Sequence, residues 1–403
     1  KLVFKITMLE IKYFPHNLNV ENKKLVVRVD LNVPLKGREI QDSTRIEQAL
    51  PFLQDLIKRK AKITLISHLG RPNGMRDNTL SLLPIYKYLK RKLSTNMYFY
   101  TGEINDEIKI KSSYLKGGEV LLIENIRFFK EETENDEKFS KKLGELGEIY
   151  INNAFSCSHR KQSSIHNITK FVKEIYAGPL LKKEIIAIDS VIKNKKDPVT
   201  CIIGGSKVST KINIIFNLMK SADNIIIVGA MANNFLVYKK YEIGKSLKEE
   251  NSDEVVEKIL NEAEEKECKI VIPDDCLVSK SFEGVAVSKN IRSIEKDDII
   301  LDIGPDTIKI IEEIIDNSNT VMWNGPAGYF ENKNFASGTN AIAQKISDNT
   351  KKKSLISVLG GGDTISAINN SGIDLSFTHL STAGGAFLEY LEGKDLPGLS
   401  VLK

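Results

Sequence analysis

A chain of 403 residues, 41% hydrophobic and 28% charged, has the composition of an ordinary globular protein with two or three domains. Its longest apolar stretch, around 225–232, is too short to span a bilayer, and we find no signal-peptide pattern at the N-terminus. A formal net charge of +5 is too small and diffuse to indicate a nucleic-acid partner. The four cysteines form no CxxC pair and no metal-ligand spacing, so we expect reduced thiols and a cytoplasmic protein.

Apolar runs alternate with amphipathic stretches along the whole chain, which predicts parallel strands separated by helices. In the first half, the predicted strands are 24–29, 63–66, 97–100, 120–123 and 149–151. Between the first two lies a predicted helix with apolar residues from Ile46 to Ile57, opened by Thr44 and Glu47 as a capping box. In the second half, a predicted helix at 180–193 precedes strands at 200–203, 225–228, 270–272, 299–301, 321–323 and 355–359.

This order predicts an α/β fold of two similar-sized domains, each a mostly parallel sheet covered by helices on both faces. Gly178 and Pro179 interrupt the pattern near the middle of the chain. We therefore predict a first domain at 1–177, an interdomain helix and hinge at 178–198, and a second domain at 199–386. The remaining segment, 387–403, is predicted to be a tail that returns to the first domain.

The strand at 63–66 leads directly into Ser67, His68, Leu69, Gly70, Arg71 and Pro72. In an open α/β sheet, ligands bind just beyond the carboxyl ends of the strands. Arg71 would therefore direct a cationic donor at such a site, and Gly70 would let the backbone approach a ligand closely. A simple strand-to-loop turn with a surface arginine remains the alternative.

The distribution of arginine favours an anion site in the first half. Only 10 of the 58 basic residues are arginines, and nine of these lie in the first 160 residues. The first 180 residues have 31 Lys+Arg against 21 Asp+Glu, and the remainder has 27 against 32. Guanidinium groups bind carboxylate and phosphate in a bidentate manner. The candidates flank strand or helix ends: Arg45, Arg71, Arg127 and Arg160.

Asp30 and Asn32 follow the first strand and, at a period of two, would project to the same side. There they could form hydrogen bonds with substrate hydroxyl groups. Asn32 could equally be a turn residue.

The second half contains three glycine-containing strand-to-helix turns, which together indicate a phosphate-rich ligand. The first turn contains Gly204 and Gly205, and after it the spacing of Lys207 and Lys211 places both ammonium groups on one helical face. The others are Gly360–Thr364 and Thr382–Gly385. Asp363 beside an anion site suggests an intervening Mg²⁺. Neither a P-loop pattern nor a dinucleotide fingerprint is present, which argues against a nucleotide-dependent dehydrogenase.

From about residue 25 to residue 403 the chain resembles the phosphoglycerate kinase family. The motifs that carry the resemblance occur in order at 28–34, 67–72, 124–128, 204–211, 323–326, 360–364, 391–393 and 396–398. The resemblance implies reversible transfer of the acyl phosphate of 1,3-bisphosphoglycerate to MgADP, giving 3-phosphoglycerate and MgATP. It also implies a monomer acting on small molecules, with no nucleic-acid or membrane partner, and two ligand sites across a cleft that closes by hinge bending for in-line transfer.

By the same resemblance, the first domain binds the triose and the second the nucleotide. The implied triose site contains Asp30, Asn32, Arg45, His68, Arg71, Arg127 and Arg160. The implied nucleotide site contains Lys207, Lys211, Asn324, Glu331, Gly361, Gly362, Asp363 and Thr364, with Asp363 towards Mg²⁺. Arg45 and Lys211 would act as the catalytic residues on the transferring phosphoryl group.

Four positions depart from the family pattern. Asn153 stands where the family usually has aspartate, Ser156 replaces its glycine, and Cys157 replaces a threonine or a similar residue. Ala230 stands where a glycine is common, near the expected adenine pocket. The rival hypothesis is a catalytically weak ligand-binding or scaffold protein that keeps the fold, and the presence of both Arg45 and Lys211 speaks against it.

Overall fold

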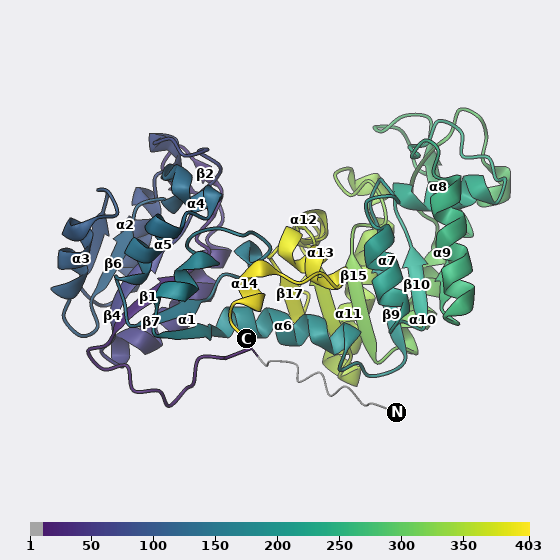
Figure 1. The fold of residues 1–403 in the computed structure, drawn as a ribbon. Helices are drawn as coiled ribbons and strands as arrows, with labels where there is room; N and C mark the ends of the chain where they lie inside the picture. The colour runs from purple at the N-terminus through teal and green to yellow at the C-terminus, as the bar shows by residue number, and fades with distance from the viewer. Residues whose placement is uncertain (1–10) are drawn as a thin grey trace, which may run out of the picture. The chain divides into compact units, whose positions relative to one another are not determined.

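The computed structural model describes residues 11–403, which form two compact units (Figure 1). Among the described residues, unit 1 comprises residues 11–183 together with Asp395–Lys403, and unit 2 comprises Glu184–Lys394. Helix α6 (Pro179–Ile192), which agrees with the helix predicted at 180–193, contains the boundary between the units.

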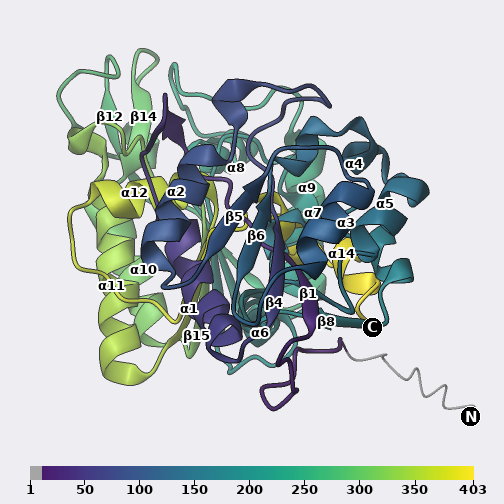
Figure 2. The same ribbon diagram turned by 90° about the vertical axis from the view of Figure 1, so that its left-hand side faces the viewer.

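A six-stranded parallel sheet forms the centre of unit 1. Its strands, in spatial order, are β5 (Met97–Tyr100), β6 (Val120–Ile123), β4 (Lys62–Ile66), β1 (Lys24–Arg28), β7 (Ile149–Asn152) and β8 (Glu174–Ala177). Helices α1 (Thr44–Lys58) and α2 (Leu83–Lys92) cover one face, and α3 (Asp106–Ser113) and α5 (Glu137–Gly144) the other (Figure 2). Leu25 and Val27 pack towards α1, while Val26 between them is also fully buried. Burial on both faces is what an apolar, non-alternating strand predicts.

Short elements complete unit 1. They are the hairpin β2 (Leu35–Lys36) and β3 (Glu39–Ile40), helix α4 (Lys130–Glu134) and, near the end of the chain, α14 (Pro397–Ser400). The last residues contact the rest of the unit through Gly398, whose N–H donates to the Ser158 carbonyl at 2.8 Å, and Leu402, whose carbonyl accepts from the Lys12 N–H at 2.9 Å.

A second six-stranded parallel sheet lies in unit 2. Its order is β11 (Lys269–Val271), β10 (Asn224–Ile227), β9 (Val199–Ile203), β15 (Thr320–Asn324), β16 (Ile356–Gly360) and β17 (His379–Ser381). The helices are α7 (Ile212–Met219), α8 (Ala230–Tyr238), α9 (Asp253–Glu265), α10 (Pro305–Asp316), α11 (Ser337–Lys353), α12 (Gly362–Asn370) and α13 (Gly385–Leu391). The predicted α/β class with mostly parallel sheets is confirmed.

One predicted strand belongs to a different kind of sheet. The apolar run at 299–301 lies in β14 (Ile299–Ile303), which pairs antiparallel with β12 (Asp275–Ser279). On its other side, β12 pairs antiparallel with β13 (Val287–Asn290). A short apolar run reports burial but not the direction of its partner, so its assignment to a parallel sheet was wrong.

The predicted capping box at the start of α1 is also wrong. Thr44 is already inside the helix, and its N–H and hydroxyl donate to Asp42 Oδ1 at 2.8 and 2.5 Å. These hydrogen bonds lower the pKa of Asp42. Glu47 instead accepts the Tyr88 hydroxyl and lies 3.0 Å from Lys92 Nζ on α2. An upstream aspartate thus competes successfully for the N–H that the box would have used.

Candidate active site

The predicted triose residues follow four adjacent strands, in the spatial order β6, β4, β1 and β7. Because these strands are parallel, the segments beyond their carboxyl ends meet at one edge of the sheet. Asp30 and Asn32 follow β1, His68 and Arg71 follow β4, Arg127 follows β6, and Arg160 follows β7. After β1 the chain first forms β4, β5 and β6 on one side of β1 and then β7 and β8 on the other side. The strand order therefore reverses at β1, which makes this edge a topological switch point.

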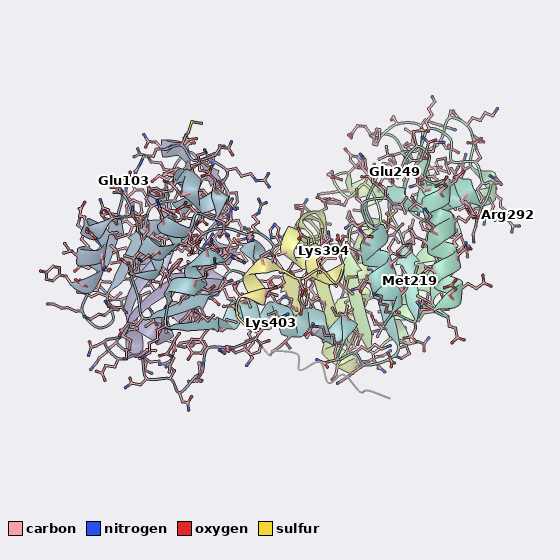
Figure 3. The ribbon with its side chains drawn as sticks, in the orientation of Figure 1. Glu103, Met219, Glu249, Arg292, Lys394 and Lys403 are labelled. Carbon is pink, nitrogen blue, oxygen red and sulfur yellow. The ribbon has the colours of Figure 1, made fainter. Side chains whose placement is uncertain are left out.

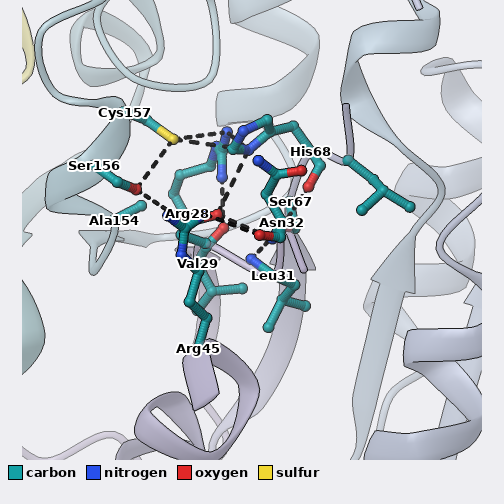
Figure 4. A network of polar contacts seen from close by, with 12 residues as sticks. Arg28, Val29, Leu31, Asn32, Arg45, Ser67, His68, Ala154, Ser156 and Cys157 are labelled. Carbon is teal, nitrogen blue, oxygen red and sulfur yellow. Dashed lines mark hydrogen bonds and ion pairs between the residues drawn. The ribbon is translucent and has the colours of Figure 1, made fainter. Parts of the chain in front are cut away.

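Asp30 is the centre of a polar network at this edge, and its partners Arg45, Asn32 and Ser156 are labelled in Figure 4. Its Oδ2 lies 3.2 Å from Arg45 Nη1 and accepts the Ser156 hydroxyl at 2.5 Å. Its Oδ1 accepts the Asn32 N–H at 3.0 Å. Arg45 also donates to the Asn32 carbonyl at 2.9 Å, so a guanidinium on α1 is fixed against the loop after β1.

Asn32 joins the loop after β1 to the turn after β4. Strand β1 ends at Arg28, so Asn32 lies in a loop, where its Oδ1 accepts the Gly70 N–H at 2.9 Å. Gly70 has a φ of +61°, and a Cβ there would lie 2.7 Å from Leu80 Cδ2. The backbone angle therefore favours glycine, and a Cβ at this position would also require the Leu80 side chain to shift.

Arg28 is a functional candidate that sequence reasoning missed. Its side chain is fully buried, and its Nη2 donates to His68 Nδ1 at 3.2 Å and lies 3.8 Å from Cys157 Sγ. Nε donates to the Ser164 hydroxyl at 3.0 Å. The signal was an arginine at the end of an otherwise apolar strand, since a buried guanidinium needs fixed partners.

Burial, with additional repulsion from four arginines, lowers the pKa of His68 well below its ordinary value. The imidazole is therefore neutral near pH 7, with Nδ1 as the acceptor for Arg28. Ligand atoms of Asp30, His68 and Cys157 lie within 4.8 Å of one another, a spacing that could hold a metal ion. The Arg28 guanidinium beside His68 and Cys157 repels a cation, so this group fits an anionic ligand better.

Three further arginines provide donors for such an anion. Arg127 is buried; its Nη1 donates to the Gly70 carbonyl at 2.8 Å, but its buried Nε has no partner among the described residues. Burial lowers the pKa of Arg127 to about 10, so it remains charged near pH 7. The guanidinium groups of Arg71 and Arg160 have no hydrogen-bond or ion-pair partner within residues 11–403. Unpaired donors of this kind are available to a ligand.

In unit 2, the glycine turns lie at the carboxyl edge of the parallel sheet. The turn at 204–207 follows β9 and the turn at 325–326 follows the adjacent β15, which is again where the strand order reverses. A cavity of about 370 Å³ opens there. Its lining includes Gly205, Ala230, Glu331 and Asp363, so it brings two predicted nucleotide residues and one departure from the family pattern together.

The prediction that Lys207 and Lys211 share one helical face is wrong. Helix α7 begins at Ile212, and both lysines precede it. Local hydrogen bonds hold the segment in a turn: the Lys211 N–H donates to the Val208 carbonyl at 3.0 Å. The Ser209 N–H donates at 3.0 Å to Glu249, which is labelled in Figure 3 and also accepts the Ser209 hydroxyl. These bonds compete with the first helical turn.

Asn324 connects Lys211 to the glycine turn at 360–364 through two hydrogen bonds. The Lys211 ammonium group donates to Asn324 Oδ1, and Asn324 Nδ2 donates to the Gly360 carbonyl at 2.6 Å. Burial lowers the pKa of Lys211, while the nearby charge of Asp363 raises it. Gly361 has a φ of +105°, and a Cβ there would lie 2.6 Å from Asn324 Nδ2. This chain of contacts places an ammonium group beside the N-terminus of α12.

Four other predicted nucleotide residues differ in accessibility. Thr364 is fully buried, and its hydroxyl accepts the Gly325 N–H at 2.7 Å, so its side chain orients a neighbouring turn. Gly362 and Asp363 are exposed in the first turn of α12. Lys207 is exposed as well.

Asp302, which also lines the unit 2 cavity, gives a testable pH dependence. Burial raises its pKa from 3.8 to about 7, although Gly338, Ile303 and Ser337 donate hydrogen bonds that oppose this shift. Because the pKa of Asp302 is higher in the folded than in the unfolded protein, its protonation stabilises the fold. This contribution is complete at a pH below the pKa of the unfolded chain and is lost as the pH rises through 7. Relative to Asp302→Asn, the wild type should therefore lose about 2–3 kcal/mol of unfolding free energy between about pH 5 and about pH 8.5.

The only tryptophan, Trp323 on β15, reports this unfolding. Its fluorescence during urea titration follows unit 2. A wild-type-to-mutant difference that stays constant across this pH range would contradict the raised pKa.

A sequence model described as phosphoglycerate kinase matches residues 16–394, nearly the whole chain. The chain belongs to the phosphoglycerate kinase family. The phosphoglycerate kinase of Wolbachia pipientis wMel is 43% identical over 389 residues, which cover 96% of this chain and 97% of that protein. That of Dictyoglomus turgidum is 43% identical over 387 residues, covering 96% of each.

Solved structures of phosphoglycerate kinases have the same fold. The enzyme from Coxiella burnetii superposes with a TM-score of 0.89 at 37% identity, covering 96% of this chain and 97% of that one. The enzyme from Pyrococcus horikoshii OT3 gives 0.80 at 29% identity, with 97% and 98% covered. The chain is thus a glycolytic kinase that transfers phosphate reversibly between 1,3-bisphosphoglycerate and ADP. None of the helices formed by residues 11–403 is long and apolar enough to cross a membrane.

Proposed function

We propose that this phosphoglycerate kinase binds its triose at the arginine-rich edge of unit 1 and its nucleotide at the glycine turns of unit 2. The observation that supports this assignment most strongly is the set of guanidinium donors without partners on Arg71, Arg127 and Arg160. The triose substrate carries a carboxylate or acyl phosphate at one end and a phosphate at the other. Charge-assisted hydrogen bonds from guanidinium groups suit both ends.

In unit 2, the proposed nucleotide ligands surround the cavity and the two adjoining turns. Ala230 and Glu331 line the cavity, and Lys207, Lys211 and the N-terminus of α12 offer positive charge to phosphates. Asn324 holds Lys211 in place, and Gly361 permits close approach of the backbone. Thr364 supports this site through Gly325.

Transfer of this phosphoryl group needs alignment and charge neutralisation but no protein base. The attacking group is an ionised phosphate oxygen of ADP in one direction and the carboxylate of 3-phosphoglycerate in the other. We assign neutralisation to Arg45 and Lys211, one from each unit, in an in-line transfer after closure of the hinge. Neutral His68 fits this scheme, because no group has to accept a proton.

The donor set of unit 2 fits Mg²⁺ carried by the nucleotide. Asp363 offers an exposed carboxylate at the cavity, and oxygen ligands from one carboxylate and the phosphates are the usual arrangement for this ion. Asp363 would hold the ion, which would neutralise charge on the transferring phosphate. A location in the cytoplasm accords with the four cysteines, all of which are buried free thiols.

The proposal predicts turnover in an assay with 3-phosphoglycerate, ATP and Mg²⁺. Formation of 1,3-bisphosphoglycerate is followed through NADH oxidation by a coupled dehydrogenase. Activity should require all three components, because the Mg²⁺ and both phosphate-bearing substrates form one reacting complex. No rate above background, with intact calorimetric binding of both substrates, would instead support the ligand-binding rival.

A further inference from the structure

Ser156 lies in the loop after β7, where this sequence has serine in place of the glycine of the family pattern. It belongs to a short 3₁₀ turn (Phe155–Cys157), and its side chain is half-buried. Its hydroxyl donates to Asp30 Oδ2 at 2.5 Å and lies 3.7 Å from the Sγ of Cys157, which is labelled beside it in Figure 4. Glycine cannot form this hydrogen bond, so the contact is particular to the serine.

The acceptor capacity of Asp30 shows what the hydroxyl does. An ionised carboxylate offers about four acceptor positions, two on each oxygen. Oδ2 is used by Ser156 and Arg45, and Oδ1 accepts the Asn32 N–H. One position therefore remains, on Oδ1, which lies 4.0 Å from His68 Nδ1. With glycine at 156, a second position would be open on Oδ2.

The same hydrogen bond also stabilises the loop that contains Arg160. The Sγ of the adjacent Cys157 lies 3.7 Å from His68 Nδ1, and the Cys157 carbonyl accepts the Arg160 N–H at 3.0 Å. At the start of the loop, Asn153, another departure from the family pattern, accepts the Leu180 N–H at 2.8 Å. Ser156 is thus the polar link between this loop and the Asp30–Arg45 pair.

We propose that Ser156 is a positioning residue for the triose. It holds the Asp30 carboxylate so that only Oδ1 accepts the substrate hydroxyl group, while Oδ2 stays bound to Arg45. The proposal rests on the assignment of Asp30 to the triose site.

The test compares Ser156→Ala and Ser156→Gly with the wild type. Loss of a hydrogen bond to a charged group should raise the KM for 3-phosphoglycerate about tenfold. The KM for ATP should change less than about twofold, since the proposed nucleotide site lies in unit 2, and kcat should fall less than the KM for 3-phosphoglycerate rises, because Arg45 keeps its hydrogen bond to the Asn32 carbonyl. Ser156→Thr keeps the hydroxyl and should restore the KM. Ser113→Ala, which removes an exposed hydroxyl on α3, is the matched control.

Calorimetric titration with 3-phosphoglycerate alone separates this proposal from catalysis. A tenfold weaker affinity of Ser156→Ala supports positioning even if the wild type shows no turnover, which would overturn only the catalytic assignment. An unchanged KM and affinity, an equal rise in both KM values, or failure of threonine to restore the KM would each overturn the role of Ser156. A wild type that does not bind 3-phosphoglycerate would overturn both proposals.

Discussion

Replacement of either Arg45 or Lys211 by alanine is expected to lower kcat about a hundredfold or more. Interactions made chiefly in the transition state raise kcat, whereas those made equally with the bound substrate lower KM. The two residues belong to different units and are proposed to meet at the phosphoryl group only in the reacting complex. Charge stabilisation in a site without water contributes several kcal/mol, consistent with this loss.

Steady-state kinetics on both mutants measure this effect, and substrate KM values should change much less than kcat. Arg38→Ala and Lys220→Ala are suitable controls, because each removes an exposed cation from the same unit as its counterpart. Arg45→Lys tests whether the charge suffices without the bidentate fork. If kcat stays near the wild-type value in both alanine mutants, neither residue acts on the transferring group.

Arg71→Ala should raise the KM for 3-phosphoglycerate about ten- to a hundredfold while leaving that for ATP nearly unchanged. Arg71 follows β4, is exposed, and has no ion-pair or hydrogen-bond partner within residues 11–403. Its removal therefore costs the free protein little. One charge-assisted contact with the triose contributes about 1.5–3 kcal/mol.

The KM values of Arg71→Ala for the two substrates are measured in the same coupled assay. Arg91→Ala is the control, since Arg91 is an exposed arginine on α2 and not a proposed ligand. Equal increases in both KM values would argue against the assignment of the triose to unit 1. The magnitude also distinguishes Arg71 from Ser156, which is expected to act only through Asp30.

The sequence predicted most of the fold because the central strands are apolar on both faces. The edge strands β8 and β17 were missed, since β8 is mostly half-buried and β17 has only three residues. β14 was found but assigned to the wrong sheet. Its partner β12 has buried residues on both faces and no local signal for antiparallel pairing. Periodicity records burial, and partner choice depends on contacts far apart in sequence.

For the candidate site, the family resemblance and the positions of the strand ends predicted which residues take part, but not which of them form hydrogen bonds with one another. Arg28 was missed because its partner His68 is 40 positions away in sequence. The hydrogen bond from Ser156 to Asp30 spans 126 positions, so no local spacing could predict it. Lys207 and Lys211 were assigned to a helix because their spacing is compatible with one. The spacing could not reveal that Glu249, 40 positions away in sequence, accepts a hydrogen bond from the Ser209 N–H and so stabilises a turn in place of the first helical turn.

Unit 1 is made from two segments of the chain, with all of unit 2 between them. During synthesis, unit 2 can be complete while unit 1 still lacks Asp395–Lys403. Gly398 packs against Ser158, next to the segment that carries Ser156 and Arg160, and Asn152 Nδ2 donates to its carbonyl at 3.4 Å. Unit 1 therefore acquires a support of the proposed triose site only after all of unit 2 has been synthesised, so we expect its folding to be completed by a segment that the intact unit 2 precedes in the chain.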